Sequence, residues 1–422
     1  MKKPLNYIPF TKEMKKTYKI LVPEMLPMHF KLITEYLKTQ GYDMETLSSH
    51  GKEIAETGLK YVHNDTCYPA ILVIGQFIDA LKSGKYDVHK TALVYFQTGG
   101  GCRASNYIFL LRKALEKAGL GFVPVISISF NGLEKHPGFK VTPKLAVKLF
   151  YCIFYGDLLL SLKNQVAPYE VNQGDAENLA NEITEELGGK MDKMKLSFKT
   201  VEKNCAEIVE RFKKIPTVKT QKPRVGVVGE IYVKFSALGN NGLEKLLLSE
   251  GAEPVVPGLM DFFIYTVYAK ITDCRLFGIG KKLYPVYVLL YKFLLAKQKR
   301  FINVVKSDGT FDAPGTFAET VKLVDGYINT GVKMGEGWLL TAEMLELKER
   351  GVKNVICAQP FGCLPNHVCG KGMMKPIKDR NPDMNIVAVD YDAGASKVNQ
   401  DNRIKLMLAL ARENLKTVGE CE

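Results

Sequence analysis

Cysteine is the residue type in this chain that points most clearly to chemistry. The sequence of 422 residues contains nine cysteines, and three of them have simple structural explanations. Cys152 lies in an apolar run, Cys205 in an amphipathic helical stretch and Cys421 near the last residue, so each is expected to be a small buried hydrophobe or an idle thiol. The other six are the candidate metal ligands, namely Cys67, Cys102, Cys274, Cys357, Cys363 and Cys369.

The positions of these cysteines favour an iron-sulfur cluster over a zinc ion. Four of the six lie beside Gly or Pro, where loops meet helix starts. The helix dipole and the free backbone N–H groups lower the thiol pKa there, and the N–H groups can bond the sulfides of a cluster. Zinc knuckles and ribbons contain closely spaced C-x₂-C pairs. The most closely spaced cysteines here are Cys357, Cys363 and Cys369, which are six positions apart. Ligands on separate loops suit a cluster held between domains.

Two glutamates and a histidine are the candidate catalytic residues. Glu24 and Glu230 each follow an apolar strand, and His63 lies just before the Cys67 loop. A Glu in this position could donate protons, or it could be a first-turn charge that interacts with the helix dipole. The matching positions of the two glutamates strengthen the catalytic interpretation.

Small and polar residues around the cysteines are the candidate cofactor-binding residues. Arg103 could offset cluster charge, hold a substrate phosphate or form a surface salt bridge, whereas Asn106 and Asn366 are expected to organise the loop backbones. The glycines of this set are Gly100, Gly101 and Gly362. A triple glycine could cradle a phosphate, but beside a cysteine we favour close approach to a cluster. The sequence has no P-loop and no G-x-G-x-x-G, so we expect no nucleotide hydrolysis in this chain.

Composition and charge describe an ordinary globular protein. The net charge is +13 and 46% of the residues are hydrophobic, which excludes disordered, collagenous and coiled-coil classes. The basic residues are mixed with acidic ones along helical stretches, so we expect no nucleic-acid partner. The most apolar segment, residues 145–162, is broken by Lys148 and Asp157, and no signal-type core follows Met1. We therefore expect a cytoplasmic protein and no membrane partner.

The pattern of elements predicts an α/β fold with two Rossmann-like parallel-sheet domains. Apolar β-type runs alternate with amphipathic helical stretches, and strands are expected at residues 19–22, 91–97, 123–130, 224–228, 354–359 and 385–390. The expected organisation has a first α/β domain over residues 1–142 with Cys67 and Cys102, and a helical segment over 143–222. A second α/β domain over 223–422 carries Cys363 and a helical insertion at about 260–331.

Two pairs of segments indicate an internal duplication. Residues 94–106 and 355–366 both read as strand, Gln, Gly-Cys, Asn and helix. Residues 20–24 and 226–230 are both apolar strands that end in a Glu. Because ligands of open α/β sheets lie beyond the carboxyl ends of the strands, facing halves would bring Cys102 and Cys363 to one cleft.

These motifs resemble a known family of iron-sulfur proteins. The stretches Asn64 to Pro69, Gln97 to Tyr107 and Gln359 to His367, followed by Val389 to Asp392, look like the C-terminal part of large 2-hydroxyacyl-CoA dehydratase activase-related proteins. More distantly, they resemble the cluster-bearing subunits of 2-hydroxyacyl-CoA dehydratases, benzoyl-CoA reductases and double-cubane cluster proteins. The similarity covers most of the chain.

The resemblance implies a low-potential reductase or 2-hydroxyacyl-CoA dehydratase-type component. A separate ATP-hydrolysing activator with its own [4Fe-4S] cluster would inject electrons, the substrate would be a small molecule or an acyl-CoA, and the protein would be a dimer. The cofactor would be a [4Fe-4S] cluster on three cysteines or a double-cubane [8Fe-9S] cluster on six, although Cys274 and Cys369 match no family motif. The alternative is a non-catalytic electron-transfer or cluster-carrying subunit of a larger complex.

Overall fold

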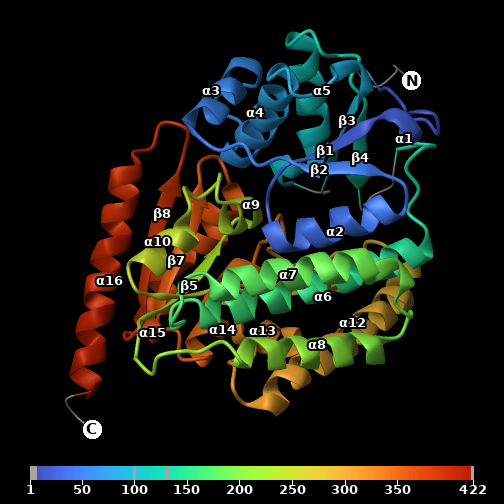
Figure 1. The fold of residues 1–422 in the computed structure, drawn as a ribbon. Coiled ribbons are helices and arrows are strands. Elements are labelled where there is room, and N and C mark those ends of the chain that lie inside the picture. Colours follow the sequence, from blue (N-terminus) through green and yellow to red (C-terminus); the bar gives the residue numbers. More distant parts are fainter. Residues whose placement is uncertain (1–6, 98–100, 130–133, 420–422) are drawn as a thin grey trace.

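Two parallel four-stranded sheets form the framework of the protein (Figure 1). The computed structural model describes residues 7–97, 101–129 and 134–419. The first sheet has the strand order β2 (Asp43–Thr46), β1 (Lys19–Val22), β3 (Thr91–Gln97) and β4 (Val125–Ser129). The second has the order β6 (Glu253–Val255), β5 (Arg224–Gly229), β7 (Asn354–Pro360) and β8 (Asn385–Tyr391).

The two sheets have the same topology, which confirms the predicted α/β class with two parallel sheets. In each, the first strand lies between the second and the third, and the fourth strand is at the edge. The strands of the central pairs are buried apolar runs, as expected for parallel sheets covered by helices on both faces. Equivalent strands therefore end at equivalent edges, and the loops after β3 and β7 occupy corresponding places.

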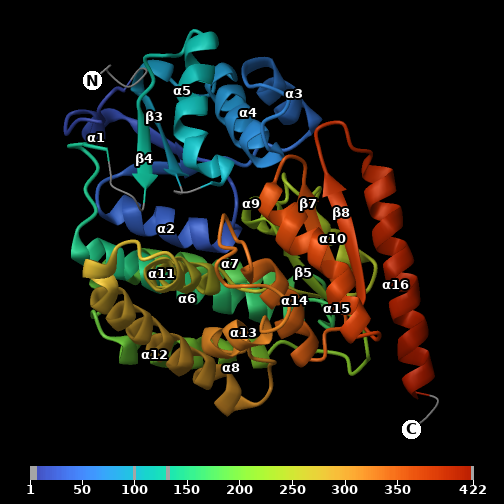
Figure 2. The ribbon, with the colours of Figure 1, turned by 180° about the vertical axis from the view of Figure 1, so that it is seen from behind.

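Helices cover both sheets and fill the space between them (Figures 1 and 2). Those flanking the first sheet are α2 (Pro27–Thr39), α3 (Lys52–Tyr61), α4 (Tyr68–Lys82) and α5 (Tyr107–Lys117). Those of the second are α9 (Ile231–Phe235), α10 (Leu243–Ser249), α14 (Leu339–Glu349), α15 (Met374–Arg380) and α16 (Lys397–Gly419). A short α1 (Met14–Thr17) precedes β1.

The two predicted helical segments pack together as one layer. The middle segment forms α6 (Pro143–Val166), α7 (Asp175–Lys190) and α8 (Phe198–Lys213). The insertion of the second half forms α11 (Met260–Leu276), α12 (Tyr284–Asp308) and α13 (Phe317–Leu323). One apolar core runs from the first sheet through these helices, and another is shared by both α/β units. The expected boundaries at 142 and 222 therefore mark changes of secondary structure, while the cores continue across them.

Helix α6 is the one described helix that is long and apolar enough to cross a membrane. In the fold, 61% of its apolar window is buried, which is the behaviour of a core helix in a soluble protein. The two polar residues that interrupt it have structural roles. Lys148 donates to the carbonyl of Met194, and the Asp157 carboxylate accepts the backbone N–H groups of Leu259 and Met260.

Candidate functional site

Three cysteines stand at helix starts around the junction of the two halves. Cys67 is the N-cap of α4, Cys102 precedes the short helix Arg103–Asn106, and Cys363 precedes the π-helical turn Asn366–Gly370. Each sulfur has a backbone N–H close enough to lower its pKa, contributed in turn by Ala70, Ala104 and Asn366. This shared geometry is the helix-start environment expected from the sequence.

Direct backbone contact joins the Cys67 helix to the Cys363 loop. The N–H of Tyr68 donates to the carbonyl of Phe361 over 3.0 Å. Gly362 lies against Cys67 with a φ of +73°, and a Cβ at this glycine would come within 3.1 Å of the Cys67 Cα atom. A side chain at Gly362 would therefore be strained by its backbone and would push the two loops apart.

A third segment, residues 332–337, lies between the two cysteine loops. The N–H of Gly101 donates to Met334 Sδ over 3.1 Å. A Cβ at Gly335, whose φ is +59°, would lie 3.7 Å from Cys102 Sγ and 3.1 Å from Pro365 Cγ. The two predicted cysteine loops are thus brought to either side of this glycine.

Buried carboxyl groups dominate the electrostatics of these thiols. Burial and the charges of Glu336 and Glu230 raise the pKa of Cys102 to about 12. The same causes raise the pKa of Cys363 further. Charge interaction with Cys102 also contributes to the raised pKa of Cys363, which places these two sulfurs in one electrostatic environment. The lowered thiol pKa expected at helix starts is therefore wrong for both, because burial outweighs the effect of the backbone N–H groups.

Cys67 has a more favourable environment for a thiolate. Burial raises its pKa, but the Tyr107 hydroxyl, 3.0 Å from Sγ, and the charge of Arg103 both lower it. Arg103 itself is exposed. Of the roles predicted for Arg103, charge compensation beside the cysteines is the one that this electrostatic contact supports.

Glu230 and Glu336 form a buried acid pair at the end of β5. Glu230 caps α9 by accepting the Val233 N–H over 2.9 Å, and Glu336 Oε1 accepts the Ile231 N–H over 3.0 Å. Burial and the nearby Glu336 raise the pKa of Glu230 to about 8. Both predicted roles of Glu230, cap and proton holder, are therefore compatible with one side chain.

Glu336 is a buried acid that was not predicted from the sequence. It lies between Gly335 and Gly337. Both glycines have positive φ, and a Cβ at Gly337 would come within 2.3 Å of the Val332 carbonyl. A Glu between two glycines that permit a tight turn is a sequence pattern that could have indicated a buried functional acid.

Glu24 occupies different surroundings from Glu230, although both follow the first strand of a half. Its Oε2 lies 3.3 Å from His50 Nε2, and its backbone N–H donates to Gln76 Oε1 over 3.2 Å. Burial raises its pKa, and the charge of His50 lowers it. Burial and the charges of both Glu24 and Glu230 raise the pKa of Tyr232.

His63 lies on the surface, where its side chain is 77% exposed. Its Nδ1 is 2.5 Å from Oδ1 of Asp65, which is also exposed. Glu230 and Glu336, by contrast, are buried beside the cysteines, so they are better placed for a catalytic role than His63.

The remaining cysteine candidates do not all join the same site. Cys357 lies within β7, with its thiol bonded to Asn366 Oδ1 over 3.4 Å, and burial raises its pKa to about 12. Cys369 shares the electrostatic environment of the site, because burial and the charge of Glu336 raise its pKa to about 11. Cys274 lies in the last turn of α11, nine residues beyond Tyr265, which is roughly 13 Å along a helix. Tyr265 is itself near Cys102 and Glu336.

Gln359 is the clearest sign that something binds here. Its side chain is 1% exposed, and neither Nε2 nor Oε1 has a hydrogen-bond partner within the part of the chain that the structure describes. An unpartnered buried amide costs about 1–3 kcal/mol per group. The sequence contains a signal for this residue, since Gln359 opens the repeated Gln-Gly-Cys unit.

The other predicted cofactor-binding residues have mixed outcomes. Asn366 is buried and organises its loop as expected, because its Nδ2 donates to the Ala358 carbonyl over 2.7 Å. Asn106 is exposed and makes no side-chain cap bond to α5. Gly101 contacts Met334 through its backbone N–H. Gly100 lies outside the residues that the structure describes.

The candidate metal ligands of this site are three free thiols on separate loops. Over residues 7–97, 101–129 and 134–419, no three His, Cys, Asp or Glu side chains converge closely enough to hold one metal ion. A cubane binds each cysteine through a different iron, so its ligands stand farther apart. Three free thiols with backbone N–H groups at their sulfurs, beside an unpartnered amide, fit such a group.

Comparison with known proteins names no family for this chain. No family model matches it, and no curated protein matches it. The function must therefore be inferred from the residues and their geometry.

Proposed function

We propose that this protein is the cluster-bearing component of an ATP-dependent reductase or 2-hydroxyacyl-CoA dehydratase-type system. The observation that carries the proposal is the set formed by Cys67, Cys102 and Cys363. These are free thiols on three separate loops, each at a helix start with a backbone N–H at its sulfur. Soft thiolate ligands select iron-sulfur clusters or zinc, and the wide spacing of these loops favours the cluster.

The three cysteines would hold a [4Fe-4S] cluster, which supplies low-potential electrons when bound. Cys67 and Cys363 are buried and Cys102 is partly buried, so the metal would be largely shielded from water, and binding would release the thiol protons. Arg103 offsets part of the added negative charge. A double cubane, which would need six cysteines, is disfavoured because Cys274 lies in the last turn of α11, roughly 13 Å along the helix from Tyr265.

The groups around the cysteines suit substrate binding and proton delivery. Gln359 offers an NH₂ donor group and a carbonyl acceptor, so it would bind a substrate carbonyl or hydroxyl group. Glu230 keeps a proton near neutral pH because burial and Glu336 raise its pKa to about 8, and it can act as a general acid. These two features favour an enzyme over a sealed electron relay, whose cluster would need neither group.

Anaerobic purification with iron and acid-labile sulfide counts tests the proposal. We expect brown protein with at least about four Fe per chain. Colourless protein that binds stoichiometric zinc after anaerobic reconstitution would contradict the cluster. A full iron count with no small-molecule binding detected at Gln359 would instead support the relay.

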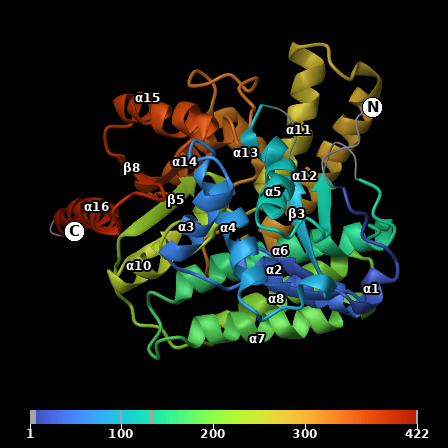
Figure 3. The same cartoon turned by 90° about the horizontal axis from the view of Figure 1, so that it is seen from above.

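A partner surface for the electron donor is proposed on the hairpin of α11 and α12, which stands out from the body of the protein in Figure 3. Exposed apolar side chains recur at helical spacing along it, with Leu289 71% exposed. The others are Leu276, Phe277, Ile279, Leu283, Val286, Leu290 and Phe293. A contiguous patch of this kind marks an interaction site.

Position and charge favour the activator as the occupant. The hairpin contacts the segment beside the cysteines, because Leu276 and Phe277 lie next to Gly331 and Asp273 pairs with Lys333 over 2.7 Å. Exposed lysines border the apolar patch, at positions 281, 282, 292 and 299. A donor docked here is close to the proposed cluster, and the lysines suit an acidic partner surface.

Salt and charge reversal test this docking surface. We expect the reduction rate to fall steeply with added salt, because steering charges act mainly on the association rate. The double variant K281E/K282E should lower the rate about tenfold at low salt and flatten its salt dependence, since association among variants of one interface spans about 1–3 decades. Lys203→Glu, on α8, is the matched control. Unchanged rates, or a salt-stable dimer formed through the patch, would contradict activator docking.

A further inference from the structure

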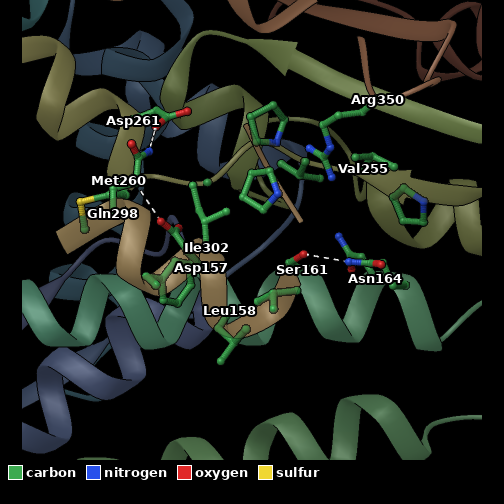
Figure 4. Close-up of a pocket in the computed structure, with 18 of the residues that line it drawn as sticks. Asp157, Leu158, Ser161, Asn164, Val255, Met260, Asp261, Gln298, Ile302 and Arg350 are labelled. Carbon is green, nitrogen blue, oxygen red and sulfur yellow. Dashed lines mark hydrogen bonds between the residues drawn. The ribbon is translucent and has the colours of Figure 1, made fainter. Parts of the chain in front are cut away.

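A polar cavity lies between the helical layer and the second sheet, away from the cysteines (Figure 4). Its walls come from α6, α11 and α12, and from β6 with the loop that follows this strand. Arg224, the first residue of β5, also lines it, whereas Glu230 of the cysteine site follows the last residue of the same strand. The strand spans roughly 17 Å at about 3.3 Å per residue, so the cavity is a separate site.

Asn164, on α6, contributes an unpaired acceptor to this cavity. Its side chain is 2% exposed, and its Nδ2 lies 3.2 Å from the Glu244 carboxylate. Because a carboxylate only accepts hydrogen bonds, this contact fixes the orientation of the amide. The Oδ1 atom has no hydrogen-bond partner among the described residues. A buried amide oxygen of this kind needs a donor from whatever fills the cavity.

Arg350 contributes an unpaired donor from the opposite wall. Its two Nη atoms are bonded to Glu346 over 3.4 Å and to Asp312 over 3.0 Å. Its Nε is buried, and no acceptor reaches it within the part of the chain that the structure describes. Figure 4 shows Asn164 and Ser161 across the cavity from Arg350. The occupant should offer an acceptor to Arg350 and a donor to Asn164, and a hydroxyl group does both.

Asp261 is an acid at the far end of the cavity (Figure 4). Its Oδ1 accepts the Gln298 amide over 2.5 Å, and no basic group among the described residues offsets its charge. Burial, followed by the charges of Glu346, Glu343 and Asp157, raises its pKa to about 8. A cation beside this carboxyl group would oppose both burial and the neighbouring acids.

The charges around the cavity favour a cation over an anion. Arg224 and Arg350 line it, but both guanidinium groups are bonded to Asp312. Neither is therefore free to hold a ligand carboxylate or phosphate. Asp261, in contrast, has an amide as its side-chain partner and no ion pair among the described residues. The electrostatic complement of this cavity is a positive group at the Asp261 end.

Size and apolar contacts limit the occupant further. The cavity has a volume of about 60 Å³. At roughly 15 Å³ per water, this space holds about four waters, or one molecule of about four non-hydrogen atoms. Leu158, Pro254, Pro257 and Ile302 are among the apolar lining residues, and they would contact a short hydrocarbon segment. The occupant is thus polar at both ends and apolar in the middle.

We propose that this cavity binds a small hydroxy-ammonium ion, of which ethanolamine is the simplest example. The ammonium group pairs with Asp261. The hydroxyl group accepts the Arg350 Nε–H and donates to Asn164 Oδ1, while the two methylene groups contact the apolar wall. Because the walls come from both the helical layer and the second sheet, the bound ion stabilises the packing of these two parts.

Calorimetry and thermal unfolding of the full chain at pH 8 test the site with three probes of four non-hydrogen atoms each. We expect ethanolamine to bind at one site per chain and to raise the unfolding temperature. Propylamine lacks the hydroxyl group, and ethylene glycol lacks the charge. Each should bind at least about tenfold more weakly, because one buried polar contact is lost. Equal affinities for the three probes, or no saturable binding of ethanolamine, would overturn the proposal and leave a cavity filled by water.

Two variants assign the ends of the ligand. Asp261→Asn keeps the size of the side chain and removes its charge, so it should weaken ethanolamine at least about tenfold and leave ethylene glycol unchanged. Asn164→Leu should weaken ethanolamine and leave propylamine unchanged. Glu207→Gln, an exposed acid on α8, is the control and should change no affinity. Unchanged ethanolamine affinity in Asp261→Asn would overturn the assignment, and the probe comparison on the unsubstituted chain decides the proposal if a variant fails to fold.

Discussion

The two halves share one strand order but differ in the loops that follow their third strands. In the first half, Gln97 Nε2 donates to the Ser105 carbonyl over 2.7 Å and closes its own loop. In the second half, Gln359 has no hydrogen-bond partner among the described residues, and Asn366 closes the loop instead. Equivalent glutamines thus have unequal tasks. The second one is freed from its loop and remains available for a ligand.

The glutamates that follow the first strands show the same divergence. Glu24 pairs with the half-exposed His50, whereas Glu230 is buried and faces a second acid, Glu336. The two glutamates lie at corresponding edges of the two sheets, but their different neighbours decide their protonation. The first half therefore contributes two of the three thiols, and the second contributes one thiol and the acids.

Substitution of the three cysteines tests whether both halves contribute ligands to one cluster, and it has the largest expected effect on iron content. Cys67→Ala, Cys102→Ala and Cys363→Ala should each remove most of the iron, because each deletes one ligand of a shared cluster. Iron and sulfide counts after anaerobic purification provide the measurement. If either half alone retained its iron after loss of the other half's cysteine, the cluster would not be shared.

Cysteines outside the site are the matched controls. Cys152→Ala, in the core of α6, should leave the iron content unchanged. Cys357→Ala should also keep its iron but lower stability by about 1 kcal/mol, because the thiol bonds Asn366. Equal iron loss in all variants would show that the effect comes from unfolding.

The pH dependence of stability separates the two glutamates. Folding raises the pKa of Glu230 from 4.5 to about 8, so the folded chain holds more protons than the unfolded chain between these values. Its contribution to stability is therefore present at low pH and is lost as pH rises toward 8, by at most about 1.4 kcal/mol per pH unit. Urea unfolding of Glu230→Gln should show a flatter pH profile. Glu24→Gln should flatten it less, because His50 opposes the rise at Glu24.

Most of the fold was predictable because its strands are continuous apolar runs. The strands at 19–22 and 91–97 begin and end where expected. The edge strands β2 and β6 were missed, since they have only four and three residues and little apolar pattern. After Cys363 the chain forms the π-helical turn Asn366–Gly370, where Asn366 bonds back to the Ala358 carbonyl, and α15 begins only at Met374.

The site was predictable only where a residue's function follows from its own type and local neighbours. Cys67, Cys102 and Cys363 were found because Gly and Pro mark the helix starts beside them. His63 is also next to a cysteine motif in the sequence, but it lies on the surface. Glu336 is far from every cysteine motif in the sequence, yet it is buried beside the thiols. Burial of polar groups depends on contacts between segments hundreds of residues apart, which periodicity does not reveal.

Substitution of Gln97 and Gln359 tests the difference between the two loops through the smallest expected changes in stability. Gln97→Leu should destabilise the cluster-free chain by about 1 kcal/mol, because the Ser105 carbonyl loses its donor. Gln359→Leu should instead raise its stability by about 1–3 kcal/mol, since it removes a buried amide without partners. Urea midpoints at one pH measure both changes. A loss of stability in Gln359→Leu equal to that in Gln97→Leu would mean that the second glutamine serves its own loop, and no ligand would be needed to explain it.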